Sequence, residues 1–215
     1  MSGPLAGYKV LDMSRILAGP WAGQLLADMG AEVIKIEKPV VGDDTRHWGP
    51  PYLKDTAGNS TEDAAYYFCA NRGKKSVTVD ITQTEGQAII RQLAAQTDVL
   101  IENYKVGGLK KYNLDYESLS AINPRLVYCS ITGFGQTGPY ADRPGYDFLI
   151  QGMGGLMSIT GEATDNNGNG GPVRTGVAVT DLFSGMYAAN AIQGALLERP
   201  RADLGQPIDL ALLDV

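Results

Sequence analysis

Asp181 is the side chain of this sequence with the clearest potential for chemistry, because no other charged residue occurs between Arg174 and Glu198. Apolar and small residues recur at helical spacing over 182–196, which predicts a helix that starts near Asp181 and is buried on nearly all sides. At a helix start, a carboxylate commonly caps free backbone N–H groups. Its other possible role is nucleophilic attack on an acyl carbon, which forms a mixed anhydride. The residue alone favours capping, so the rest of the sequence must decide.

Cations and one histidine are the other candidates for binding or proton transfer. Lys38 follows a predicted strand, where a cation suits a phosphate group, although a solvated strand end is the simpler explanation. The densest basic cluster, 72–75, indicates either an anion contact or a solvated turn. His47, beside Trp48 in a polar segment, is a weak candidate for a general acid or base. No metal-ligand spacing is present.

The elements that must position these residues begin with a β-α-β unit. A strand is predicted over 8–13, a helix over 21–29 after Gly19-Pro20, and a second strand over 32–37. We expect the two strands to be parallel, with a right-handed crossover. The segment between them lacks the G-x-G-x-x-G fingerprint of dinucleotide-binding proteins, so the sequence gives no glycine signal for NAD.

Strands and helices continue to alternate along the chain. Further strands are predicted over 76–80, 99–101 and 125–131, with helices over 84–95 and 116–122. This pattern predicts the α/β class, with a doubly wound, mostly parallel, Rossmann-like sheet and helices on both faces. Ligands bind such sheets beyond the carboxyl ends of the strands, where polar residues 102–104 and the Gly-rich loop 133–139 fall. The polar segment 40–65 is expected to be a long surface loop.

The composition is that of one globular domain, with 215 residues, 44% of them hydrophobic and 20% charged. A formal net charge of −6 argues against a nucleic-acid partner, which requires clustered Lys and Arg. Cys69 and Cys129 lie in separate apolar runs and are expected to be reduced core residues. We find neither a signal peptide nor an uncharged run of about 18 residues, so we expect an intracellular protein without a membrane partner, cytoplasmic or in the mitochondrial matrix.

Together these motifs resemble the class III CoA-transferase family, which includes formyl-CoA transferases, carnitine CoA-transferases and methylacyl-CoA racemases. The resemblance extends over the whole chain and is carried by PLAGYKVLD, LAGPWAGQLLADMGAEVIKIEKP, GDDTRHWGPP, NRGKKSVTVD, DVLIENY, NPRLVYCSITGFGQTGP, PGYD, VTDLFSGMYAA and GQPIDLALLD. Within the family, the sequence is most similar to enzymes that move CoA from succinyl-CoA to other carboxylic acids. The resemblance implies acyl-CoA and a carboxylic acid as substrates, no tightly bound cofactor and no metal.

The resemblance also assigns roles to individual residues. Asp181 falls on the family's nucleophile, and Tyr146 falls on an active-site position that is histidine in the racemases. Because tyrosine ordinarily has a pKa near 10 and is a poor base, CoA transfer is favoured over proton transfer at the acyl α-carbon. Contacts with CoA are implied for Ile16, Lys38, Ala70, Asn71, Asn103, Tyr104 and Lys111, the last standing where many members carry Arg. Arg15 and Arg174 are either ligands of the far carboxylate of a dicarboxylic acid or surface arginines.

Family members are about twice as long as this chain, which bears on its domains and activity. Residues 1–198 are expected to form the N-terminal part of an incomplete CoA-binding large domain, and 199–215 to begin a linker towards a small domain. The apolar end, 207–215, carries no capping or turn signal, so we expect the sequence to continue. The family implies an interlocked homodimer. An acyl-CoA racemase or epimerase and an inactive CoA-binding fragment remain as alternatives.

Overall fold

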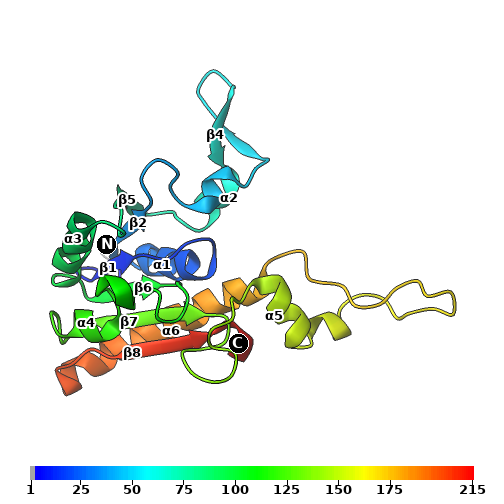
Figure 1. The fold of residues 1–215 in the computed structure, drawn as a ribbon. Coiled ribbons are helices and arrows are strands. Elements are labelled where there is room, and N and C mark those ends of the chain that lie inside the picture. Colours follow the sequence, from blue (N-terminus) through cyan, green and yellow to red (C-terminus); the bar gives the residue numbers. More distant parts are fainter. Residues whose placement is uncertain (1–2) are drawn as a thin grey trace.

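Six parallel strands form the central sheet of the computed structural model, which describes residues 3–215 (Figure 1). The strands are β1 (Lys9–Asp12), β2 (Glu32–Glu37), β5 (Lys74–Thr78), β6 (Val99–Glu102), β7 (Val127–Thr132) and β8 (Pro207–Ala211). Their spatial order is β5-β2-β1-β6-β7-β8, which is the order of a doubly wound Rossmann sheet. The predicted fold class is therefore confirmed.

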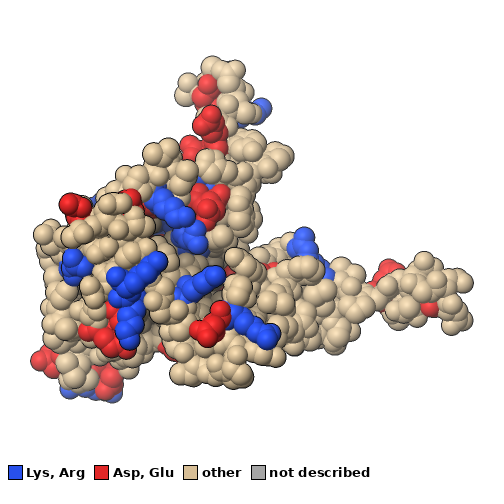
Figure 2. All heavy atoms as spheres, viewed as in Figure 1, with Lys and Arg blue, Asp and Glu red and all other residues tan. Residues whose placement is uncertain are grey.

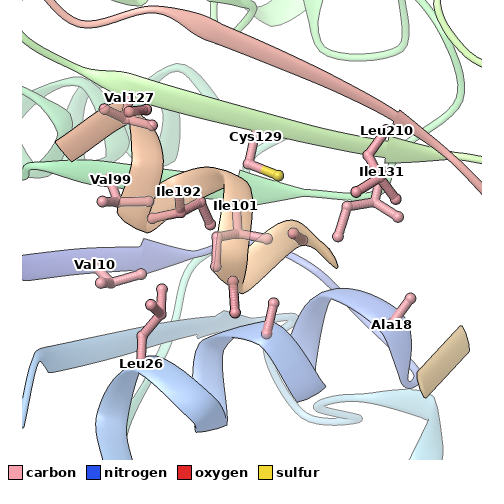
Figure 3. Close-up of a cluster of buried hydrophobic side chains, with 14 of the residues drawn as sticks. Val10, Ala18, Leu26, Val99, Ile101, Val127, Cys129, Ile131, Ile192 and Leu210 are labelled. Atoms are coloured by element: carbon pink, nitrogen blue, oxygen red, sulfur yellow. The ribbon is translucent and has the colours of Figure 1, made fainter. Parts of the chain in front are cut away.

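Helices cover both faces of this sheet because successive strand residues point to opposite sides. On one face, Val10 and Ile101 pack with Ile192 (Figure 3). On the other, Leu11 packs in a second cluster with Ile90. The helices of the first face are α1 (Ala18–Asp28) and α6 (Val179–Ala202), and those of the second are α3 (Thr84–Ala94) and α4 (Tyr116–Ser120).

Chain order reverses between β1 and β6, which lie side by side in the middle of the sheet. From β1 the chain winds outward through β2 to β5, and from β6 it winds the other way through β7 to β8. The loops after β1 and β6 therefore diverge at the carboxyl edge of the sheet. Such a divergence leaves a crevice, which is the usual ligand site of open α/β sheets.

Two arms project from the sheet domain in Figure 1. One is an antiparallel hairpin of β3 (Tyr52–Lys54) and β4 (Ser60–Ala64), between η1 (Asp44–His47) and α2 (Ala65–Cys69). The other is the loop between η3 (Leu156–Ile159) and α6. Their tips share the sequence D-x-x-G-N, in which Asp55 and Asp165 accept backbone N–H groups of the turn. The segment 40–65 is thus partly regular structure, not the unstructured loop that its polarity predicts.

The helix that carries Asp181 is buried on one face only. Small and apolar side chains such as Ala188 and Ile192 pack towards α1 and the sheet, whereas Phe183, Met186 and Tyr187 are about half exposed. The expectation of burial on nearly all sides is wrong because only one side of α6 meets the sheet and α1. No helix within residues 3–215 is long and apolar enough to cross a membrane.

The structure also differs from the sequence prediction in the C-terminal segment 199–215 and at one cysteine. α6 continues past 198 to Ala202, and β8 pairs with β7 in the sheet, so 207–211 is a sixth strand where a linker was expected. Cys129 is buried in β7, but Cys69 is exposed. The prediction of a buried Cys69 is wrong because α2 is a short helix outside the sheet, with only part of its surface covered.

Candidate functional site

A cavity of about 830 Å³ opens at the carboxyl edge of the sheet, where the two windings diverge. Its walls come from the ends of five strands and from the start of α6. The lining includes 15–18 after β1, 36–39 at the end of β2, 79–82 after β5, 103–106 after β6, 131–133 at the end of β7, and 143–146 with Asp181. This is the position at which open α/β sheets bind ligands.

Asn103, in the loop after β6, is hydrogen-bonded to the backbone of the loop after β1 and so links the two diverging loops. Its amide oxygen accepts the backbone N–H of Arg15 at 2.9 Å, and its amide nitrogen donates to the carbonyl of Arg15 at 2.7 Å. Both ends of the Asn103 side chain are therefore engaged with protein backbone. The residue lines the cavity, as expected of a CoA contact, but its side chain positions the loop after β1.

Ile16 has an unusual backbone conformation, with φ of 71°. A β-branched residue in this left-handed region is strained, so its surroundings must hold it there. The backbone N–H of Ile16 faces the carboxylate of Asp43, at 3.3 and 3.4 Å from its two oxygens. Asp43 is itself paired with the buried Lys35 at 2.9 Å, and Lys35 also donates to the carbonyl of Ser14. This buried pair fixes the shape of the wall next to β1.

Cations dominate the rim of the cavity. Five Lys and Arg residues line it: Arg15, Lys38, Lys105, Lys111 and Arg143. Within residues 3–215, only Arg15 of these five forms an ion pair, with Asp44 at 2.8 Å. Figure 2 shows Lys and Arg side chains gathered on this face of an otherwise acidic protein. The arrangement suits an anionic ligand, because the available positive charge is concentrated at one opening.

Asp181 is the third residue of α6 and contributes to the cavity wall. Among residues 3–215, its side chain accepts no hydrogen bond, so the capping role that its position suggests is not observed. Asp147 fulfils that role instead, accepting the backbone N–H and the hydroxyl of Thr180 at 2.8 and 2.7 Å. Burial, together with the negative charge of Asp147, raises the pKa of Asp181 to about 7. The carboxylate of Asp181 is thus poorly solvated and is not held by a hydrogen bond within the described chain.

Tyr146 lies at the same wall, directly before α5 (Asp147–Met153). Its side chain is 66% exposed, and no hydrogen bond within residues 3–215 fixes its hydroxyl. Tyr104 and Ile16 also line the cavity, as do Lys38 and Lys111. The structure therefore brings together most of the residues implied by the family resemblance.

Three of the expected residues lie outside the cavity lining. Ala70 is buried, and the side chain of Asn71 binds the carbonyl of Tyr67 and the ammonium of Lys74. Arg174 is exposed, and its guanidinium contacts the neighbouring carbonyl of Thr175 at 3.3 Å. These side chains are drawn into local backbone contacts, which spacing in the sequence does not reveal.

The basic turn and the histidine are also placed elsewhere. Arg72 pairs with Asp28, and Lys75 pairs with Glu32. The third cation of the cluster, Lys74, is buried against Asp12 at 2.7 Å. An anion contact at 72–75 is therefore not supported, since protein carboxylates already neutralise the cluster. His47, exposed and bonded to the carbonyl of Val41, is not part of the cavity lining.

The structure adds site residues that sequence reasoning missed. Lys105 and Arg143 line the cavity, as does the segment 79–82. A usable signal existed for each, since Lys105 directly follows the polar strand end 102–104 and Arg143 precedes the PGYD motif. The segment 79–82 follows β5 at the same edge of the sheet, so its position was implied by the topology alone.

Comparison with known proteins identifies close relatives over the entire chain. Residues 5–215 match the sequence profile of CoA-transferase family III. The succinate–glutarate CoA-transferase of Agrobacterium fabrum is 57% identical over 212 residues, which are 99% of this chain and 52% of that protein. The human succinyl-CoA:glutarate CoA-transferase is 49% identical over 210 residues, covering 98% of this chain and 45% of that protein.

A solved structure has the same architecture. The crystal structure of a CaiB/BaiF family protein from Brucella suis superposes with a TM-score of 0.92 at 56% identity, covering 100% of this chain and 54% of that chain. This chain spans about half the length of the curated relatives it matches.

Proposed function

Because this chain belongs to CoA-transferase family III, we propose that the whole protein moves CoA from succinyl-CoA to a dicarboxylic acid such as glutarate, with Asp181 as the nucleophile. The observation that carries the proposal is the Asp181 carboxylate, which faces a cation-rimmed cavity and is not engaged as a helix cap. The substrate class comes from the two CoA-transferases to which this chain is similar.

The chemistry proceeds in two symmetric halves. Ionised Asp181 attacks the thioester carbon of succinyl-CoA, which expels CoA thiolate and leaves a mixed aspartyl–succinyl anhydride. The thiolate then attacks the aspartyl carbonyl, releasing succinate and forming an Asp181–CoA thioester. The acceptor carboxylate attacks this thioester, and the freed thiolate takes the acyl group from the new anhydride. The first half leaves Asp181 as a CoA thioester and the second half restores its carboxylate, so the full cycle requires neither a redox step nor an added proton donor.

The surroundings of Asp181 support this role. A pKa of about 7 leaves a substantial fraction of the carboxylate ionised at neutral pH, while poor solvation preserves its reactivity. In the proposed complex, Lys38, Lys105, Lys111 and Arg143 hold the phosphates of CoA.

The acceptor's second carboxylate is assigned to Arg15, since Arg174 lies outside the cavity lining. The ion pair of Arg15 with Asp44 is partly exposed, so the guanidinium is available for exchange with a substrate carboxylate. The exposed apolar side chains of α6, including Phe183, Met186 and Tyr187, are consistent with the homodimer that the family implies.

CoA exchange tests the proposal directly. The whole protein is incubated with succinyl-CoA and glutarate, and glutaryl-CoA is measured for the unsubstituted protein and for Asp181→Asn. We expect a loss of about a thousandfold or more in kcat for Asp181→Asn. Asp165→Asn is the matched control and should retain activity, because Asp165 lies in the exposed turn at the tip of the loop between η3 and α6. Turnover by Asp181→Asn at the normal rate contradicts the proposal, and deuterium wash-in at the acyl α-carbon without an acceptor would favour a racemase.

A further inference from the structure

The N-terminus of α6 obtains its hydrogen-bond acceptor from a different helix. The residue before α6, Ala178, has no side-chain acceptor for the free N–H groups of the first turn. Asp147, the first residue of α5, supplies one. Its Oδ1 atom accepts the backbone N–H of Thr180 at 2.8 Å and the Thr180 hydroxyl at 2.7 Å. A contact between helices thus does the work of a local cap.

Asp147 is itself held in place by a buried amide. Its Oδ2 atom accepts the side-chain N–H of Gln151 at 2.7 Å, and the Gln151 oxygen accepts the backbone N–H of Thr175 at 2.9 Å. Gln151 is fully buried. The chain of contacts therefore joins both ends of the segment 175–180 to α5, so the start of α6 cannot move independently of α5.

We propose that Asp147 is a positioning residue for Asp181, which rests on the function proposed above. Asp181 is the third helical residue, from which a carboxylate can fold back onto the free N–H groups of its own helix. Asp147 supplies an acceptor for Thr180 from outside the helix, and Asp181, which accepts no hydrogen bond within residues 3–215, stays at the cavity wall. Two acids therefore share one helix terminus, with Asp147 as the cap and Asp181 as the nucleophile.

The charges around the pair reinforce this division. Asp147 accepts three hydrogen bonds, whereas Asp181 accepts none within residues 3–215. Asp181 is faced by Asp147 on α5 and by Tyr66 on α2, whose own pKa is raised chiefly by burial and further by both acids. Tyr146 lines the same wall. No Lys or Arg of the described chain forms an ion pair with either acid, so the negative charge of Asp147 acts on Asp181 uncompensated.

Two substitutions at Asp147 separate charge from capping. Asp147→Asn keeps an oxygen that can accept from Thr180, at the expense of the contact with Gln151, and removes the charge, so the midpoint of the acid limb of kcat/KM should move to lower pH. The ratio of rates at pH 6 and pH 8 should rise roughly two- to fivefold. Asp147→Ala removes the cap, and kcat should fall at least about tenfold with KM for succinyl-CoA changed less than about twofold, because misplacement of a nucleophile affects the reaction more than binding.

The experiment uses the whole protein, with Glu85→Gln as control because Glu85 is an exposed acid in the first turn of α3. Its pH profile and kcat should be unchanged. The inference is overturned if Asp147→Asn leaves the pH profile where it was, or if Asp147→Ala retains kcat or loses activity only through KM. If the unsubstituted protein transfers no CoA, the proposed function fails instead, and the positioning role fails with it.

Discussion

Replacing Glu102 by Gln should make the stability of the protein much less sensitive to pH. Glu102 ends β6 and is 5% exposed, with its carboxyl group bonded to the Ser130 hydroxyl and to the backbone N–H of Tyr104. Burial raises its pKa to about 7, from an ordinary value of 4.5. The folded protein therefore binds this proton more tightly than the unfolded chain does.

The sign and size of the effect follow from that difference. The stabilising contribution of the protonated group is fully present below pH 4.5 and is lost as the pH rises through about 7. At 1.36 kcal/mol for each pH unit, the contribution is roughly 3 kcal/mol, an upper figure because the folded structure can relax around the charge. Gln has a similar shape and cannot ionise, so Glu102→Gln should exceed the unsubstituted protein in stability by roughly 2–3 kcal/mol at pH 8.

Urea denaturation at pH 4.5, 6 and 8, followed by tryptophan fluorescence, measures this difference. The variant and the unsubstituted protein should have nearly equal free energies of unfolding at pH 4.5 and should diverge as the pH rises. Glu85→Gln, at an exposed site, controls for the loss of one formal charge. The reasoning is refuted if Glu102→Gln is less stable at pH 8, or if the gap between the two proteins does not grow with pH.

Other substitutions test the parts of the site separately. Asn103→Ala removes both hydrogen bonds to the Arg15 backbone and should raise KM for succinyl-CoA roughly tenfold in a steady-state assay. Arg15→Met should raise KM for glutarate about tenfold but KM for butyrate less than twofold. The exposed control Lys54→Met should change neither KM. Equal effects on both acids would contradict the assignment of Arg15 to the second carboxylate of the acceptor. Lys35→Met leaves the buried Asp43 carboxylate without its cation and should lower the free energy of unfolding by about 3 kcal/mol in urea denaturation. An unchanged free energy of unfolding would contradict the pairing. Because the pKa of Asp181 is raised to about 7, the rate of its reaction with succinyl-CoA should be about tenfold lower at pH 6 than at pH 8, as followed by quenched-flow mass spectrometry; a flat profile would count against it as the nucleophile.

The sheet was predictable because its signals are local. Strands such as 32–37 alternate with helical segments such as 84–94, and strand ends carry polar residues, so the fold class and the edge of the sheet that holds the site both follow from the sequence. β8 was not predicted as a strand, because its sequence, PIDLA, is short, contains a proline and an acid, and has no turn signal after it. Its identity depends on pairing with β7, a contact between distant parts of the chain.

The site was predictable only where a residue's role follows from its place at a strand end. Lys38 and Tyr104 come within two residues of strand ends and do line the cavity. The role of Asp147 could not be predicted, since its contact with Thr180 joins residues 33 apart in the sequence. For the same reason, the local position of Asp181 by itself favoured capping, and only the family motifs pointed to a nucleophile. The structure assigns the cap to a residue that only the fold brings near.

Oxygen transfer to Asp181 is the most direct test of the nucleophilic role. The protein is allowed to turn over with succinyl-CoA and glutarate labelled with ¹⁸O in its carboxylates, and the peptide that contains Asp181 is then analysed by mass spectrometry. When thiolate cleaves the aspartyl–glutaryl anhydride at the glutaryl carbon, the bridging oxygen from glutarate remains on Asp181. The proposed mechanism therefore predicts ¹⁸O in that carboxylate. Formation of glutaryl-CoA with no ¹⁸O on Asp181 would contradict it.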